Sequence, residues 1–298
     1  MSLILVVPGC PERYSWWFLD NRSSSSKNHT LIGEQKANIT PRSARGHVLS
    51  SAATVLRAQI ESTLAKRIPG ALTVRPAIEP EAISIGIPAL DRRSVGIPRG
   101  CLSEICGPAS SGRTTLLLSL MREVTEQGEC CALIDASNAF DPLSASANGV
   151  NLARLFCARC AAPHPKLSPV DKSLKATDMI LSAGGFGLVV LDLGDIEPRL
   201  AKKIPLSYWY RFRRAVELTA ATFIVLEQQP SAKSCASLVI TLQRNSSEWV
   251  PTRGQPQNPK LLTGANFAAD VTRSRIAASQ GKPPQTATEF RVATSWAG

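Results

Sequence analysis

The chain has 298 residues, of which 44% are hydrophobic, so it can hold one large domain with an appendage. Its formal net charge of +11 favours an anionic partner, nucleic acid first. The eight cysteines fall mostly in apolar runs, which excludes a disulfide scaffold and predicts a cytoplasmic protein. No apolar stretch is long enough to cross a bilayer, so a membrane partner is not expected.

The first part of the chain is predicted to lie outside the main domain. Residues 1–47 lack periodicity and include a serine run, which predicts a disordered extension. From Val48 to Ile68 apolar residues recur at helical spacing, and a proline–glycine pair follows, so residues 48–82 are predicted to form one amphipathic helix and a linker. The helix could pack on its own domain or on a partner. The core is then expected over residues 83–298.

The stretch Leu102–Thr115, LSEICGPASSGRTT, predicts a buried strand, a glycine-rich turn and the start of a helix. From Gly107 its spacing is one residue away from the phosphate-binding pattern G-x-x-x-x-G-K-[ST], because Arg113 replaces the lysine. Backbone N–H groups and the helix N-terminus would face the phosphates. An ordinary strand–loop–helix junction is the alternative. The residues predicted to contact the ligand are Gly107, Ser110, Ser111, Gly112, Arg113, Thr114 and Thr115.

Further elements follow from the alternation and length of apolar runs. Helices are predicted at Thr114–Gln127 and Lys172–Leu181, strands at Leu152–Ala158, Phe186–Leu193, Thr222–Gln228, Ser237–Arg244, Asp270–Ile276 and Glu289–Thr294, and a loop at Gly254–Pro259.

Asp192 lies at the end of the apolar run FGLVVLDL, which is typical of a parallel strand buried on both faces. A carboxylate at that end of a strand can orient Mg²⁺, with the Thr114 hydroxyl as a second contact. A strand-end aspartate that caps a turn is the alternative.

A basic stretch with aromatic residues lies between Arg199 and Arg214. Cations neutralise phosphates and rings stack on bases, so the stretch suits single-stranded DNA. A surface helix with a solvated basic face and a buried aromatic face explains the same pattern equally well. The candidate DNA contacts are Arg199, Lys202, Lys203, Arg211, Arg213 and Arg214.

From Ile83 onward the chain resembles the RecA recombinase family. The resemblance rests on Ile83, Gly86, Leu90, Asp91, Gly96, Pro98, Gly100, Gly107, Pro108, Ser110, Ser111, Gly112, Thr114 and Thr115, and then on CALIDASNAFDP. It implies an α/β fold, a RecA-like core with a mostly parallel sheet flanked by helices. It also implies ATP and Mg²⁺ as cofactors, Asp141 as the adenine contact and Gln228 as a sensor of the γ-phosphate.

Several positions depart from the family's pattern. Ser137 stands at the place of the catalytic glutamate, Ser144 at that of the adenine-stacking tyrosine, and only Pro230–Cys235 occupy the place of a long DNA-binding loop. This profile is similar to the ImuA group of RecA-related mutasome accessory proteins.

The resemblance therefore implies an ATP-binding DNA-repair adaptor in SOS-induced translesion synthesis, with weak or no ATP hydrolysis. Single-stranded DNA and a translesion polymerase, such as one of the Y family, are the expected partners, and a homo-oligomer is allowed. The alternatives are a divergent single-stranded-DNA-dependent ATPase and recombinase, and a purely structural cell-division or DNA-coating protein.

Overall fold

A computed structural model describes residues 55 and 59, 81–92, 96–217, 219–251, 260–275 and 287–294. The chain divides into two units, one of residues 20–78 and the other of the remainder. Val55 and Gln59 are helical, within the helix predicted for residues 48–68. The expected extension 1–47, most of 48–82 and the predicted loop Gly254–Pro259 lie outside the described residues.

The larger unit is built on an eight-stranded sheet with the order β10-β9-β8-β3-β7-β6-β4-β5. The strands from β8 to β5 in this order run parallel, while β9 and β10 are antiparallel additions. The strands are β3 (Leu102–Cys106), β4 (Cys131–Asp135), β5 (Leu155–Arg159), β6 (Leu188–Asp192), β7 (Thr222–Glu227), β8 (Leu238–Pro251), β9 (Lys260–Ser274) and β10 (Thr288–Ala293). A two-stranded sheet, β1 (Ala82–Ile83) with β2 (Ile97–Pro98), precedes them.

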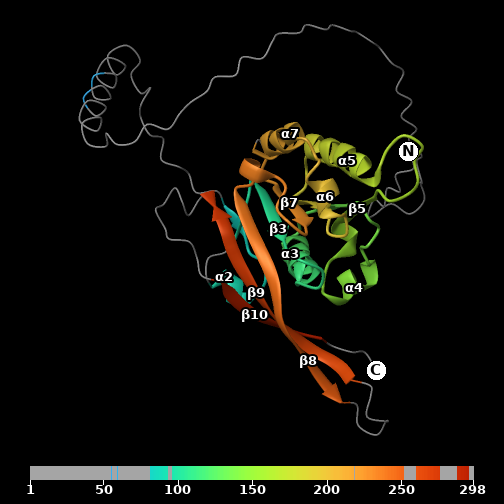
Figure 1. The fold of residues 1–298 in the computed structure, drawn as a ribbon, viewed down its shortest axis with the longest axis vertical. Helices are drawn as coiled ribbons and strands as arrows, with labels where there is room; N and C mark the ends of the chain where they lie inside the picture. Colours follow the sequence, from blue (N-terminus) through green and yellow to red (C-terminus); the bar gives the residue numbers. More distant parts are fainter. Residues whose placement is uncertain are drawn as a thin grey trace, which may run out of the picture. The chain divides into compact units, whose positions relative to one another are not determined.

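Helices cover both faces of this sheet (Figure 1). Along β6, Leu188 and Val190 join the core beneath α3, whereas Val189 and Leu191 join the core beneath α5 and α7. The nearly continuous apolar run is thus explained by burial on two sides. The predicted fold class, α/β with a mostly parallel central sheet flanked by helices, is confirmed. The helices are α2 (Pro88–Asp91), α3 (Arg113–Glu126), α4 (Pro142–Ala147), α5 (Pro169–Ala183), α6 (Pro198–Ala201) and α7 (Leu206–Glu217).

Some predicted boundaries differ from the structure. The strand predicted from Leu152 begins at Leu155, because a 3-10 turn occupies Leu152–Arg154. Helix α5 starts earlier than predicted, because a capping box between Ser168 and Asp171 closes its first turn. No described helix has the length and apolarity needed to traverse a bilayer.

The last strands differ most from prediction. The strand expected at Asp270–Ile276 is the end of β9, which begins at Lys260 and pairs with β8 along its length. Strand β3 pairs only with Leu238–Thr241 of β8, so the remainder of β8 and its partner β9 extend past the parallel strands (Figure 1). A long antiparallel hairpin therefore lies beyond the carboxyl end of β3.

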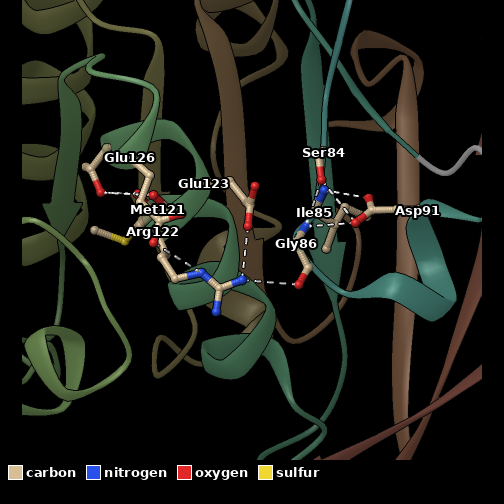
Figure 2. Close-up of polar contacts among 9 residues, drawn as sticks. Ser84, Ile85, Gly86, Asp91, Met121, Arg122, Glu123 and Glu126 are labelled. Atoms are coloured by element: carbon tan, nitrogen blue, oxygen red, sulfur yellow. Dashed lines mark hydrogen bonds and ion pairs between the residues drawn. The ribbon is translucent and has the colours of Figure 1, made fainter.

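The segment before the sheet anchors α3 through polar contacts (Figure 2). The Asp91 carboxylate accepts hydrogen bonds from the amides of Ile85 and Gly86 at 2.8 and 3.0 Å, and Arg122 of α3 donates to the Gly86 carbonyl at 3.3 Å. Gly86 has φ +75°, and a Cβ there would lie 2.6 Å from the Glu123 carboxylate. The motif around Gly86 and Asp91 therefore positions the helix that follows the phosphate loop.

Two carboxyl groups lie fully buried between β3 and β7. Glu104 accepts hydrogen bonds from the amides of Ser231 and Ala232, and the Glu227 carboxyl accepts from the Ser231 hydroxyl at 2.6 Å. Burial, together with the hydrogen bond and charge of Glu104, raises the pKa of Glu227 to about 9. Glu227 therefore keeps its proton at neutral pH.

This pair makes stability depend on pH. Glu227 holds a proton in the native state up to about pH 9, whereas the unfolded chain releases it near its ordinary value of 4.5. Stability is therefore expected to fall as pH rises through this window, by up to about 1.4 kcal/mol per pH unit from this group. Chemical unfolding between pH 5 and 9 should show a flatter pH dependence for Glu227→Gln, while Glu126→Gln on the exposed end of α3 should follow wild type. Equal slopes in all three proteins would contradict the prediction.

Candidate functional site

The predicted phosphate loop has the geometry that its glycines require. Gly112 has φ +92°, and Ser110 before it has φ +60°, so the chain turns sharply into α3. A Cβ on Gly107 would lie 2.5 Å from the backbone oxygen of Leu242, and one on Gly112 would lie 2.9 Å from the Phe267 ring. Both positions therefore exclude any larger residue. The predicted strand, turn and helix are all present.

A cavity of about 300 Å³ opens beside this loop. The side-chain oxygen of Ser111, which is 1% exposed, has no hydrogen-bond partner among the described residues. Thr114 is exposed and Thr115 half-buried on the first turn of α3. The arrangement offers hydroxyl groups and the positive end of a 14-residue helix to an anion. The lining residues are Ser110, Ser111, Gly112, Arg113, Thr114, Thr115, Arg244, Ser247, Leu262, Ala265, Phe267, Val292 and Thr294.

Arg113 is already engaged by the protein. Its side chain is only 8% exposed, and its Nη1 donates to the carbonyl of Gly194 at 3.1 Å. Gln228 also donates to this carbonyl, at 3.2 Å from Nε2. The Arg113 guanidinium therefore contacts the loop after β6, whereas the lysine at this position of the phosphate-binding motif contacts the phosphates.

Asp192 lies at the same place. Its Oδ1 accepts a hydrogen bond from the Gly194 amide at 2.8 Å. Burial raises the pKa of Asp192 to about 6, while the Gly194 hydrogen bond and the Arg113 charge act in the opposite direction. The structure therefore brings together Arg113, Asp192 and Gln228, which lie far apart in the sequence. A hydroxyl on α3 and an acidic side chain beside its first turn are chemically suited to Mg²⁺, although no group of three or more His, Cys, Asp or Glu side chains gathers among the described residues.

Ser137 lies on a loop organised by Asp135. The carboxylate of Asp135 is fully buried and accepts hydrogen bonds from the amides of Ser137, Ala139 and Phe140 at 3.1, 3.2 and 2.9 Å. The Ser137 hydroxyl is buried without a hydrogen-bond partner among the described residues. Asp135 is thus committed to the backbone, and position 137 carries no ionisable group.

Asp141 acts as a helix cap. It accepts hydrogen bonds from the amides of Leu143 and Ser144 at the start of α4, and from the Ser144 hydroxyl at 2.5 Å. The hydrogen bonds from Ser144 and Leu143 lower the pKa of Asp141. Its expected adenine contact stays a prediction, and any such contact would share the carboxylate with this cap.

The basic stretch divides into two parts. Arg211 pairs with Asp178 at 2.7 Å, and Arg213 pairs with Glu217 at 2.7 Å, so both guanidinium groups on α7 have acidic partners. Trp209 and Phe212 are fully buried in the core, in agreement with the surface-helix alternative for these rings. These two rings cannot stack on bases, whereas Tyr210 on the same helix is exposed, so base stacking by α7 stays a prediction.

The other part lies beyond the carboxyl end of β6. Lys202 donates to the side chain of Gln229, which follows β7, at 2.7 Å, and Arg199 lies 3.6 Å from the carboxylate of Glu197. Lys203 and Arg214 are exposed. Arg199, Lys202 and Lys203 therefore share one edge of the sheet with the phosphate loop.

Sequence reasoning missed the wall that the antiparallel hairpin adds to the cavity. Arg244 and Ser247 of β8, Phe267 of β9 and Val292 of β10 all line it. The strand prediction for β9 began at Asp270, after the residues that reach the cavity. The only signal was a weak alternation from Lys260, broken by Gly264.

Part of the chain is similar in sequence to known proteins. Residues 52–199 match the RecA N-terminal domain. Over 137 residues the chain is 39% identical to Protein RecA of Rickettsia canadensis (strain McKiel), a match that covers 45% of this chain and 38% of that relative. Over 97 residues it is 40% identical to Protein RecA of Ectopseudomonas oleovorans, covering 33% and 26%. The chain thus spans less than half the length of these curated relatives.

The position of Arg113 can be tested through stability. Arg113→Ala removes a buried charged donor from the Gly194 carbonyl and a cation from beside Asp192, so it should destabilise the protein by about 1.5–3 kcal/mol. Arg214→Ala, at an exposed position on α7, should change stability by less than about 0.5 kcal/mol. Urea unfolding of both variants measures the difference, and equal midpoints would show that the Arg113 guanidinium is free.

Proposed function

Because residues 52–199 match RecA and the described chain has a RecA-like fold, we propose that this protein binds ATP and Mg²⁺ as a DNA-repair accessory protein. It acts as an adaptor in SOS-induced translesion synthesis and hydrolyses ATP weakly or not at all. In this proposal the phosphate loop and Thr114 hold the nucleotide and metal, with Asp192 as the acidic partner of the metal.

The observation that carries the proposal is the contrast between the loop and the residues around it. The loop keeps the backbone geometry that phosphate binding needs, and Thr114 is exposed on the first turn of α3. At the same time, Ser137 supplies no general base and Arg113 is engaged with Gly194. Binding groups are thus retained where hydrolytic groups are missing, which favours a nucleotide-dependent adaptor.

One observation favours the alternative, a DNA-dependent ATPase and recombinase. Asp192 and Gln228 both reach Gly194, beside the first turn of α3, where a metal ligand and a phosphate sensor would be needed. Against it, only residues 228–237 connect β7 to β8, and this segment includes a 3-10 turn. A long DNA-binding loop therefore has no place between these strands.

The adaptor role requires a partner protein and DNA. A translesion polymerase is the proposed protein partner, and single-stranded DNA binds through the basic edge made by Arg199, Lys202 and Lys203. Capture from DNA-damaged cells with the full chain tests the first part. Recovery of recombination proteins without any translesion polymerase would contradict it.

Hydrolysis separates the two functions. General-base assistance contributes about 10²–10⁴-fold in rate, and a serine cannot provide it, so phosphate release should be near background with or without single-stranded DNA. Ser137→Glu, alone or with Arg113→Lys, should raise the rate, and Ser137→Gln provides a control of similar size without the charge. Vigorous DNA-stimulated hydrolysis by the unchanged protein would favour the recombinase.

DNA binding should depend more on the basic edge than on α7. Arg211 and Arg213 pair with acidic groups at 2.7 Å, whereas Lys203 is exposed and Arg199 has a longer ion pair, 3.6 Å from Glu197. Replacing Arg199, Lys202 and Lys203 with Gln should make the slope of log affinity against log salt concentration less negative, by about 0.7 for each lost phosphate contact. The matched triple change at Arg211, Arg213 and Arg214 should have a smaller effect. A larger effect of the α7 triple would move the DNA surface to that helix.

A further inference from the structure

The antiparallel hairpin of β8 and β9, which lines one side of the cavity, packs on the phosphate loop through an aromatic side chain. Phe267 of β9 is 6% exposed, stacks on Phe290 with ring centroids 5.5 Å apart, and lies so close to Gly112 that no Cβ fits there. The antiparallel hairpin is therefore packed directly on the turn into α3. Side chains near Phe267 on β8 are held at a defined place beside the cavity.

Arg244 is such a side chain. In the register of β8 with β9 it is the direct partner of Phe267, and it lines the same cavity as Ser110, Ser111 and Thr114. The cross-strand arrangement thus places a cation opposite the phosphate loop.

The charge of Arg244 is unused by the described protein. The side chain is exposed, and no ion pair or hydrogen bond joins it to another described residue. Arg291 on β10, by contrast, is paired with Glu248 at 2.6 Å. Among the residues that line the cavity, Arg113 and Arg244 carry the charges, and none is acidic. Arg113 is buried and donates to Gly194 through Nη1, so Arg244 is the exposed cation of the cavity lining.

We propose that Arg244 is the phosphate-binding cation of this site. It contacts the phosphates in place of Arg113, the residue at the lysine position of the loop motif. The inference rests on the proposed nucleotide binding and identifies the recognised chemistry as the polyphosphate group. The guanidinium offers a planar pair of donors to phosphate oxygens, while the backbone amides, the N-terminus of α3 and the exposed Thr114 bind from the side of the loop.

The test is equilibrium binding of Mg²⁺–ATP by the full chain, with inorganic tripolyphosphate as a competitor that lacks a base. Arg244→Gln should weaken binding of both ATP and tripolyphosphate by about 10- to 100-fold, since a charge-assisted contact is lost. Arg244→Lys should recover most of the affinity, because it keeps the charge. Arg214→Gln removes the same charge from α7, on the other face of the sheet, and should bind like wild type. Circular dichroism and thermal unfolding establish that each variant is folded.

Three results would overturn the inference, and they differ in what else they reject. If wild type binds and Arg244→Gln binds equally well, the Arg244 assignment fails while the nucleotide site stands. If Arg244→Gln weakens ATP but not tripolyphosphate, Arg244 contacts the base or sugar and the phosphate assignment is wrong. If wild type binds neither ligand at millimolar concentration, the proposed nucleotide site fails together with the inference.

Discussion

The arrangement of the site depends on one backbone unit, Gly194. Its carbonyl accepts hydrogen bonds from Arg113 and from Gln228, and its amide donates to Asp192. These contacts join the first turn of α3 to the ends of β6 and β7. Because parallel strands end at the same edge of the sheet, a single turn after β6 can reach both neighbours. The phosphate loop is thereby fixed to the sheet by side chains as well as by β3, and the cation of the motif has become part of the framework.

The sequence was most informative where local pattern and burial agree. The turn between β3 and α3, and strands β3 and β7, were predicted well because glycine spacing and continuous apolar runs are local signals. The direction of Arg113 was not predictable, because its partner Gly194 is 81 residues away in the chain. The hairpin wall was also missed. Strand β9 is mostly half-buried, with few fully buried side chains, so its alternation is weak, and its pairing with β8 shifts register at several points.

The backbone groups and the side chains of the candidate site differ in what they offer a ligand. The turn at Gly112 and the N-terminus of α3 are present, and backbone groups of this kind can bind an anion without a particular side chain. Position 137, by contrast, holds a serine, which carries no ionisable group. Asp135, which could have offered a carboxylate nearby, is occupied by three backbone amides. A fold can keep recognition of a ligand while losing chemistry on it, because the two depend on different kinds of atoms.

The buried proton on Glu227 also changes the electrostatics of the whole molecule. The formal net charge of +11 counts every glutamate as ionised. With its pKa raised to about 9, Glu227 is neutral in the folded protein at pH 7 and does not contribute the negative charge that the formal count assigns to it. Folding at neutral pH is therefore coupled to the uptake of a proton at this carboxyl.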